Sequence, residues 1–194
     1  MEDRLDHRVI ESVVHHGSRV LDLGCGKGEL LLLLSQEKNA RVQGIELDDK
    51  AVRECVKRGL NVFHSDIESG LSEYPDGSFD FVILNQSMQE VRNVNFLLQE
   101  ALRVGRKVIV GIPNFAHLKA RIMLALGGRA PITEALPHRW HDTPNVRFLS
   151  ILDFQEFCRS KGFRILKVLP LGVHRIITFF PNLLALNAVF VLTK

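Results

Sequence analysis

Three glycines at alternate positions could bring a ligand close to the main chain. Gly24, Gly26 and Gly28 follow a short apolar stretch that ends at Leu23, and a leucine-rich segment comes next. Glycine adopts backbone conformations that other residues rarely take, and its missing Cβ lets a ligand approach the backbone. The first turn of the following helix has N–H groups without partners in the helix, which suits an anionic or hydrogen-bonding ligand. The stretch therefore predicts a nucleotide-type cofactor site at the first strand-to-helix turn of a doubly wound sheet.

The spacing of the glycines argues against a dinucleotide. A G-x-G-x-x-G fingerprint would need its third glycine at position 29, where this chain has Glu29. An acid, Asp22, instead stands two residues before the first glycine. This pattern resembles the first motif of class I S-adenosylmethionine-dependent methyltransferases. An NAD-binding oxidoreductase is an alternative that the mismatch disfavours.

Two further acids end the next two apolar stretches of the chain. Glu46, followed by Leu47, stands about 20 residues after the glycine loop, where an acid can accept hydrogen bonds from two ribose hydroxyls. In the methyltransferase pattern, Asp66 accepts a hydrogen bond from the adenine amino group and the apolar Ile67 packs on the ring. Asp48 has a simpler role, because an Asp at this position is a natural helix N-cap. The acids predict an adenosine-containing cofactor.

Residues near the next strand end and inside the loop complete the candidate site. Asn85 and Gln86 follow a buried apolar stretch, and we expect them to contact the methionine part of the cofactor. Cys25 has neither metal-ligand spacing nor a visible histidine partner, so we expect it to pack beside the cofactor. Asp80 is expected to make a structural hydrogen bond. The candidate cofactor-binding residues are Asp22, Gly24, Cys25, Gly26, Gly28, Glu46, Leu47, Asp66, Ile67, Asn85 and Gln86.

Apolar stretches alternate with segments of helical periodicity, and this alternation predicts the fold. Strands are expected over residues 19–23, 42–46, 60–65, 79–84, 107–111, 163–169 and 188–192. Helices are expected over residues 5–14, 29–37, 48–59, 93–103, 114–126 and 150–161. Such an order predicts a parallel sheet with helices on both faces and a ligand beyond the carboxyl ends of its strands. We therefore expect a single α/β, Rossmann-like domain over residues 1–194, with a mostly parallel seven-stranded sheet that finishes in an antiparallel hairpin, as in class I methyltransferases.

Residues 114–148 are expected to form a lid or insertion over the site. Long irregular segments in compact domains are often lids or binding loops. Its candidate substrate or lid residues are His117, Trp140, His141 and Asp142. The two histidines or the aspartate could act as a base towards an acceptor, although hydrogen bonding within the lid is the simpler role for each histidine. Trp140 could stack on a substrate, but a lone tryptophan is more often a core residue.

The chain also resembles one particular family, the MetW family, over nearly its whole length. The resemblance is carried by residues 20–26, 78–84, 113–117 and 140–145, and the last two segments are not generic to methyltransferases. It implies S-adenosylmethionine as cofactor, with S-adenosylhomocysteine as product or bound ligand. It also implies a place in methionine biosynthesis and a homoserine O-acyltransferase as partner. It supplies no methyl acceptor, so two functions stay open: a methyltransferase for a small molecule or protein, and a non-catalytic, cofactor-sensing regulatory subunit.

The composition of the chain limits the kinds of partner, cellular compartment and metal site that we expect. The 194 residues are 46% hydrophobic and 24% charged, as in ordinary globular proteins. A net charge of +3 without a basic stripe disfavours a nucleic-acid partner. Three cysteines without framework spacing, and the start Met1-Glu2-Asp3 without a signal-peptide pattern, lead us to expect a cytoplasmic protein. No metal site is expected, and whether the chain forms a homo-oligomer is left open.

The C-terminal part contains the most apolar stretch, residues 176–192. One proline and two asparagines interrupt it, which favours core strands over a membrane span. The part around residues 179–184 is also a candidate docking surface, with core packing as the simpler expectation.

Overall fold

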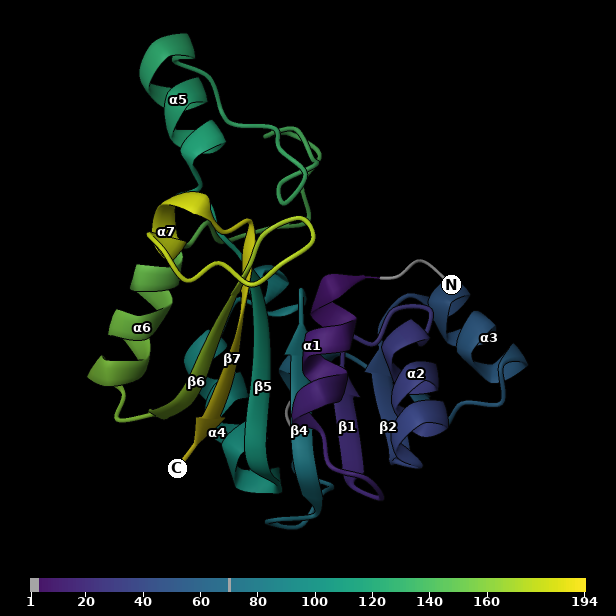
Figure 1. Cartoon of the computed structure of the whole chain (residues 1–194). Coiled ribbons are helices and arrows are strands. Elements are labelled where there is room, and N and C mark those ends of the chain that lie inside the picture. The colour runs from purple at the N-terminus through teal and green to yellow at the C-terminus, as the bar shows by residue number, and fades with distance from the viewer. Residues whose placement is uncertain (1–3, 70) are drawn as a thin grey trace.

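A seven-stranded sheet forms the centre of the molecule (Figure 1). The computed structural model describes residues 4–69 and 71–194, so the acidic start lies outside the described residues. The strands are β1 (Arg19–Leu23), β2 (Arg41–Glu46), β3 (Val62–His64), β4 (Phe79–Asn85), β5 (Gly105–Pro113), β6 (Arg164–Leu171) and β7 (Asn187–Thr193). Their order is β3-β2-β1-β4-β5-β7-β6, and only β7 runs antiparallel to its neighbours β5 and β6. The expected mostly parallel sheet with an antiparallel finish is confirmed.

Helices cover both faces of this sheet, as the alternation predicts. They are α1 (Leu5–Val13), α2 (Glu29–Lys38), α3 (Asp49–Lys57), α4 (Val94–Val104), α5 (Leu118–Gly127), α6 (Ile151–Ser160) and α7 (Pro181–Leu184). Successive side chains of a strand point to opposite faces. On β4, Ile83 therefore packs with Ile10 of α1, whereas Leu84 packs with Leu98 of α4 and Phe154 of α6. The core is two apolar layers, one on each face of the sheet.

Capping side chains determine where several helices begin. The carboxylate of Asp48 accepts a hydrogen bond from the N–H of Lys50 at 3.1 Å, which confirms its expected role as the N-cap of α3. Ser150 and Asp153 form a reciprocal capping box at the start of α6. These caps satisfy N–H groups that have no partner within the helix, so the helices begin where the sequence predicts.

The helix expected over 114–126 begins four residues later, at Leu118. The buried Asn114 side chain donates hydrogen bonds to the carbonyls of Ala185 at 2.8 Å and Asn182 at 3.1 Å, and its oxygen accepts from Ala116 N. These bonds hold residues 114–117 against the segment before β7 and keep them out of the helix. α5 then projects from the end of the sheet, with only Ala120 buried (Figure 1).

The expectation of core strands before residue 187 is wrong. Pro181 has no N–H for a strand ladder and suits the first position of a helix, and here it begins the short helix α7. Phe179 and Phe180, directly before it, are 70% and 61% exposed. Trp140 is 77% exposed and is likewise not a core residue. No described helix is long and apolar enough to cross a membrane.

Phe190 of β7 offers a test of the core. Its ring is fully buried and lies edge-to-face with Phe154 of α6 at 4.7 Å between centroids. We expect Phe190→Ala to lower the free energy of unfolding by about 3–5 kcal/mol, measured by urea denaturation, because the change leaves a cavity in a packed layer. Phe179→Ala is the matched control and is expected to change it by less than about 0.5 kcal/mol. Equal effects for the two variants would contradict this core assignment.

Candidate functional site

The glycine loop joins β1 to α2 at the edge where the parallel strands end. All three glycines have left-handed backbone conformations, with φ of 78° at Gly24, 54° at Gly26 and 75° at Gly28. A Cβ at Gly24 would lie 2.7 Å from Cβ of Ser87, and one at Gly28 would lie 2.4 Å from a methyl group of Leu60. The left-handed conformation favours glycine at both positions, and at Gly24 the nearby Cβ of Ser87 also leaves no space for a side chain.

The carboxylate of Glu46 holds this loop in place from the end of β2. Its Oε2 accepts a hydrogen bond from the N–H of Gly26 at 2.7 Å. Its Oε1 accepts from the N–H groups of Leu47 at 2.8 Å and Asp48 at 2.9 Å. A carboxylate offers about four acceptor positions, so Glu46 can accept a further hydrogen bond from a ligand. The side chain of Leu47, 62% exposed, lies beside it.

Asp22 is a buried acid with one carboxylate oxygen that no described residue donates to. Its side chain is 3% exposed, and its Oδ1 has no hydrogen-bond partner among the described residues. Burial, with a smaller contribution from the charge of Glu46, raises the pKa of Asp22 to about 7. A buried polar atom without a partner is costly, so this position is suited to a ligand that donates a hydrogen bond.

Asn85 links the end of β4 to the N-terminal helix. Its Nδ2 donates to Asp6 at 2.8 Å, and Asp6 also accepts two hydrogen bonds from Arg4, at 3.2 Å and 2.7 Å. Burial alone favours the neutral acid, but these hydrogen bonds hold the pKa of Asp6 below its usual value. The next residue, Gln86, has a φ of 61°, a strained conformation for a residue other than glycine, of a kind found at functional sites. The carboxyl edge thus carries a charged cluster that includes helix α1.

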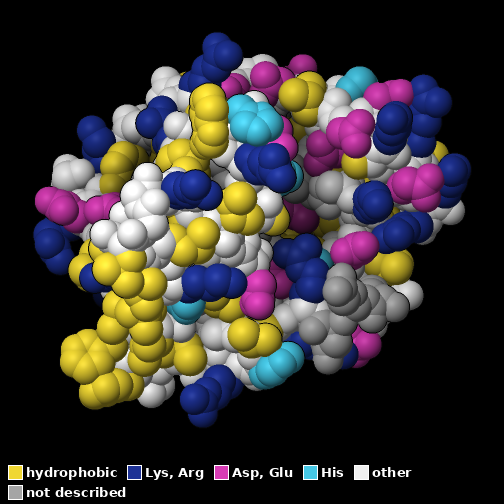
Figure 2. All heavy atoms as spheres, turned by 90° about the horizontal axis from the view of Figure 1, so that it is seen from above, with side chains coloured by type: hydrophobic (Ala, Val, Ile, Leu, Met, Phe, Trp, Pro, Cys, Tyr) yellow, Lys and Arg dark blue, Asp and Glu magenta, His cyan; other side chains and the backbone are white. Residues whose placement is uncertain are grey.

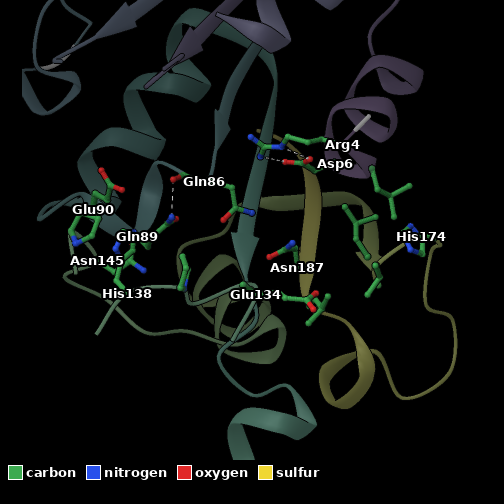
Figure 3. Close-up of a pocket in the computed structure, with 18 residues that line it drawn as sticks. Arg4, Asp6, Gln86, Gln89, Glu90, Glu134, His138, Asn145, His174 and Asn187 are labelled. Atoms are coloured by element: carbon green, nitrogen blue, oxygen red, sulfur yellow. Dashed lines mark hydrogen bonds and ion pairs between the residues drawn. The ribbon is translucent and has the colours of Figure 1, made fainter. Parts of the chain in front are cut away.

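Two cavities adjoin one another at this edge. The smaller, of about 250 Å³, is lined by Asp22, Gly24, Cys25, Gly26, Asn85 and Gln86, together with His7 of α1 and Arg4 directly before that helix. The larger, of about 610 Å³, shares Arg4 and Gln86 with it. Figure 3 shows a second wall of the larger cavity opposite Arg4, formed by Gln89, Glu90, His138 and Asn145. The structure therefore brings six of the eleven predicted cofactor residues to one cavity, with room beside it for another molecule.

Asp66 and Ile67 lie farther along the same edge, after β3. Asp66 is exposed, and its Oδ1 accepts a hydrogen bond from the N–H of Glu68 at 2.8 Å. Ser65 N donates to the carbonyl of Glu46 at 3.1 Å, so the two strand ends are adjacent. Glu46, Leu47, Gly28, Asp66 and Ile67 do not line either of the two cavities. Their roles toward an adenosine group stay predictions.

The four lid candidates are spread over the insertion. His117 caps α5, with its Nδ1 accepting from Lys119 N at 3.3 Å. Trp140 and His141 contact each other edge-to-face, and Asp142 accepts a hydrogen bond from Arg139 N at 2.7 Å. None of the four lines the larger cavity. The insertion contributes other residues to that cavity, among them Glu134, His138 and Asn145. Only position within the insertion could have indicated these residues, because no spacing pattern marks them.

Arg4, His7, Gln89 and Glu90 were also missed by sequence reasoning. Arg4 directly precedes α1, His7 lies in α1, and the other two belong to the short 3-10 helix Met88–Glu90. The fold brings both segments to the strand ends.

Cys25 and Asp80 have contacts that fit a structural role. Cys25 is 8% exposed and packs with Leu31 and Cys55, and burial raises the pKa of its thiol, which disfavours a nucleophilic role. Asp80 accepts a hydrogen bond from the N–H of Arg19 at 2.9 Å, which confirms the expected structural bond. Among residues 4–69 and 71–194, no group of three or more His, Cys, Asp or Glu residues could hold a metal ion.

The raised pKa of Asp22 predicts a pH-dependent stability. Between the ordinary pKa near 4 and about 7, the folded chain holds a proton here that the unfolded chain has lost, so stability falls as the pH rises. Three pKa units correspond to about 4 kcal/mol. The free energy of unfolding of Asp22→Asn, measured with urea, should therefore rise by about this amount relative to that of the unchanged chain between pH 4 and pH 7.5. Asp80→Asn is the control, because the lowered pKa of Asp80 keeps it ionised over most of this range. Parallel pH profiles for Asp22→Asn and the unchanged chain would contradict the assignment.

Comparison with known proteins identifies relatives for nearly the whole chain. The family model described as "Methionine biosynthesis protein MetW" matches residues 4–192. The "Bifunctional methionine biosynthesis protein MetXA/MetW" of Rhodopirellula baltica is 37% identical over 161 residues, which are 78% of this chain and 26% of that protein. The "Ribosomal protein L11 methyltransferase" of Burkholderia mallei is 32% identical over 106 residues, which are 54% of this chain and 35% of that protein. The chain therefore spans only about a quarter to a third of the length of these curated relatives.

Solved structures share the fold. A possible histamine N-methyltransferase from Thermotoga maritima superposes with a TM-score of 0.69 at 21% identity, covering 98% of this chain and 88% of that chain. An S-adenosylmethionine-dependent methyltransferase from Mesorhizobium loti gives a TM-score of 0.70 at 17% identity, covering 96% of both chains. The fold is that of class I S-adenosylmethionine-dependent methyltransferases, and by its sequence the chain belongs to the MetW family of methionine biosynthesis proteins.

Proposed function

We propose that this chain binds S-adenosylmethionine at the carboxyl edge of the sheet and acts in methionine biosynthesis together with a homoserine O-acyltransferase. One observation carries the cofactor proposal: Glu46 at the end of β2 accepts a hydrogen bond from Gly26 in the middle of the glycine loop. Glu46, proposed to bind the ribose, and the glycine loop, proposed to bind the rest of the cofactor, are therefore joined by a hydrogen bond.

The residues at this edge fit the functional groups of the cofactor. The free acceptor position of Glu46 suits ribose hydroxyls, and Asp66 with Ile67 suits the adenine amino group and ring. The unpartnered oxygen of Asp22 suits a donor near the loop. Asn85 and Gln86 would hold the methionine part from the end of β4. Acceptor atoms predominate in this set, and hydroxyl and amino groups are the donors that such a set binds.

Methyl transfer is the second candidate function, and the larger cavity favours it. When bound, S-adenosylmethionine supplies a methyl group on a sulfonium. Transfer needs an acceptor held in line and water excluded, with little acid–base chemistry. The cavity of about 610 Å³ offers space for an acceptor beside the cofactor cavity, and its Glu90 and His138 could take a proton from it. A sealed cofactor cavity would instead have favoured a sensor without an acceptor.

Two observations support the acyltransferase as partner: the family to which the chain belongs, and the two functions joined in the name of one relative. The name of the Rhodopirellula baltica protein, MetXA/MetW, joins two functions in one chain, and this chain matches 26% of it. Fusion keeps two parts at high effective concentration, which favours parts that act together. S-adenosylmethionine could then act as an effector, provided that it binds two states of the assembly with different affinity.

The first test is cofactor binding by Glu46→Ala. Losing hydrogen bonds to a charged acceptor costs about 1.5–3 kcal/mol each, so we expect affinity for S-adenosylmethionine to fall at least tenfold in calorimetric titration. Glu37→Ala, an exposed change on α2, is the control and should bind like the unchanged chain. Unchanged affinity of Glu46→Ala would refute the cofactor site.

The second test is the rate of the homoserine O-acyltransferase with and without this chain, titrated with S-adenosylmethionine. We expect the rate to change when this chain is added, and a dependence on S-adenosylmethionine would make the chain a sensor. No rate effect, with no complex in size-exclusion chromatography, would refute the partnership and leave catalysis on an unknown acceptor.

A further inference from the structure

Helices α5 and α7 lie at one end of the molecule (Figure 1). Large apolar side chains on α5 and directly before α7 are exposed there. Leu126 is 85% exposed, Phe179 70% and Phe180 61%. Leu118 and Ile122 of α5 are 40% and 48% exposed. We call these five residues the cap surface. Such side chains normally lie in a core, and a group of them on the surface indicates a site of interaction.

The area of the cap surface approaches that of a protein interface. At these exposures the two phenylalanine side chains present on the order of 250 Å². With the three aliphatic side chains the total is roughly 550 Å², near the upper end of the roughly 300–600 Å² of the largest apolar patch on a typical monomer. A stable complex buries about 800 Å² on each partner. The cap surface is therefore large enough to form most of one side of an interface.

Hydrogen bonds order the two segments that form the cap surface. Asn114, before α5, bonds to the carbonyls of Asn182 and Ala185 in and after α7. Arg121 of α5 donates to the carbonyl of Ala116 at 2.6 Å. The rings of Phe179 and Phe180 contact each other edge-to-face at 4.3 Å between centroids. A surface ordered before binding loses less conformational entropy when a partner docks.

The segments around the cap surface carry a positive charge, which favours a partner with a negatively charged surface. Residues 114–148 and 172–186 contain six Lys or Arg residues and only two Asp or Glu residues. Seen from above, hydrophobic side chains gather on the side of α5 and α7, with Lys and Arg side chains around them (Figure 2). A second copy docked by two-fold symmetry would bring the same basic surface against itself, and the like charges would repel. A partner with an acidic rim would be attracted instead.

We propose that the cap surface docks a different protein, which presents an apolar patch rimmed by Asp and Glu side chains. The inference rests on the proposed function in one respect: the partner is the homoserine O-acyltransferase. The cap surface includes α5 of the insertion, and Glu134 and His138 of the same insertion line the larger cavity. Docking would therefore bring the partner next to the lid residues of the candidate site.

Surface plasmon resonance with the purified acyltransferase of the same organism tests this inference. We expect Leu126→Ser combined with Phe179→Ser to weaken binding at least tenfold, because both lose central apolar contacts. Lys119→Glu combined with Arg129→Glu should also weaken binding and reduce its dependence on salt. The matched control combines Val56→Ser with Phe96→Ser, two exposed apolar positions on α3 and α4, and should bind within twofold of the unchanged chain. Urea unfolding midpoints close to that of the unchanged chain confirm that the variants fold.

Each other outcome overturns a separate statement. Equal binding by the unchanged chain and both cap-surface variants would overturn the docking surface and leave the partnership intact. No binding by the unchanged chain would overturn the partnership itself, and the inference with it. Self-association in sedimentation velocity that the Leu126→Ser, Phe179→Ser variant abolishes would assign the surface to a second copy instead.

Discussion

The hydrogen bonds that converge on the Glu46 carboxylate are the interaction on which the candidate site depends. They join the end of β2 to the glycine loop after β1, at the place where the chain turns from strand to helix. The loop can take this path because glycine adopts the left-handed conformations at Gly24 and Gly28, and because Gly24 has no Cβ to collide with Ser87. A loop held by a charged acceptor keeps its N–H groups and carbonyls in one arrangement, which is the preorganisation that tight binding requires.

Unpaired and strained groups lie close to this interaction. Asp22 has a buried oxygen without a donor, and Gln86 has a left-handed backbone at the end of β4. Each raises the free energy of the folded chain, and the surrounding sheet must offset the cost. Such costs are concentrated at the edge where the parallel strands end, whereas the two apolar layers of the core contain ordinary close-packed side chains. This contrast separates the part of the fold that gives stability from the part suited to bind a ligand.

The insertion connects the candidate site with the surface of the molecule. Its residues 134–145 contribute to the larger cavity, and its helix α5 carries exposed apolar side chains away from the sheet. Asn114 ties the beginning of the insertion to the segment before β7. One continuous segment thus borders both the larger cavity and the proposed docking surface, so occupancy of one could influence the other through direct contacts.

Local patterns in the sequence determined the alternation of strands and helices along the chain. They also determined the glycine loop and the acids at the strand ends. These features follow from periodicity and turn chemistry, which act between residues close in the chain. Only the tertiary structure decided that Arg4 and His7, at the start of α1, reach the strand ends. It also decided that Glu134 and His138 line the larger cavity while His141 and Asp142 do not, and that Phe179, Phe180 and Trp140 are exposed. These outcomes depend on contacts between distant segments, such as Asn85 with Asp6 and Asn114 with Ala185, and no local pattern encodes such pairings.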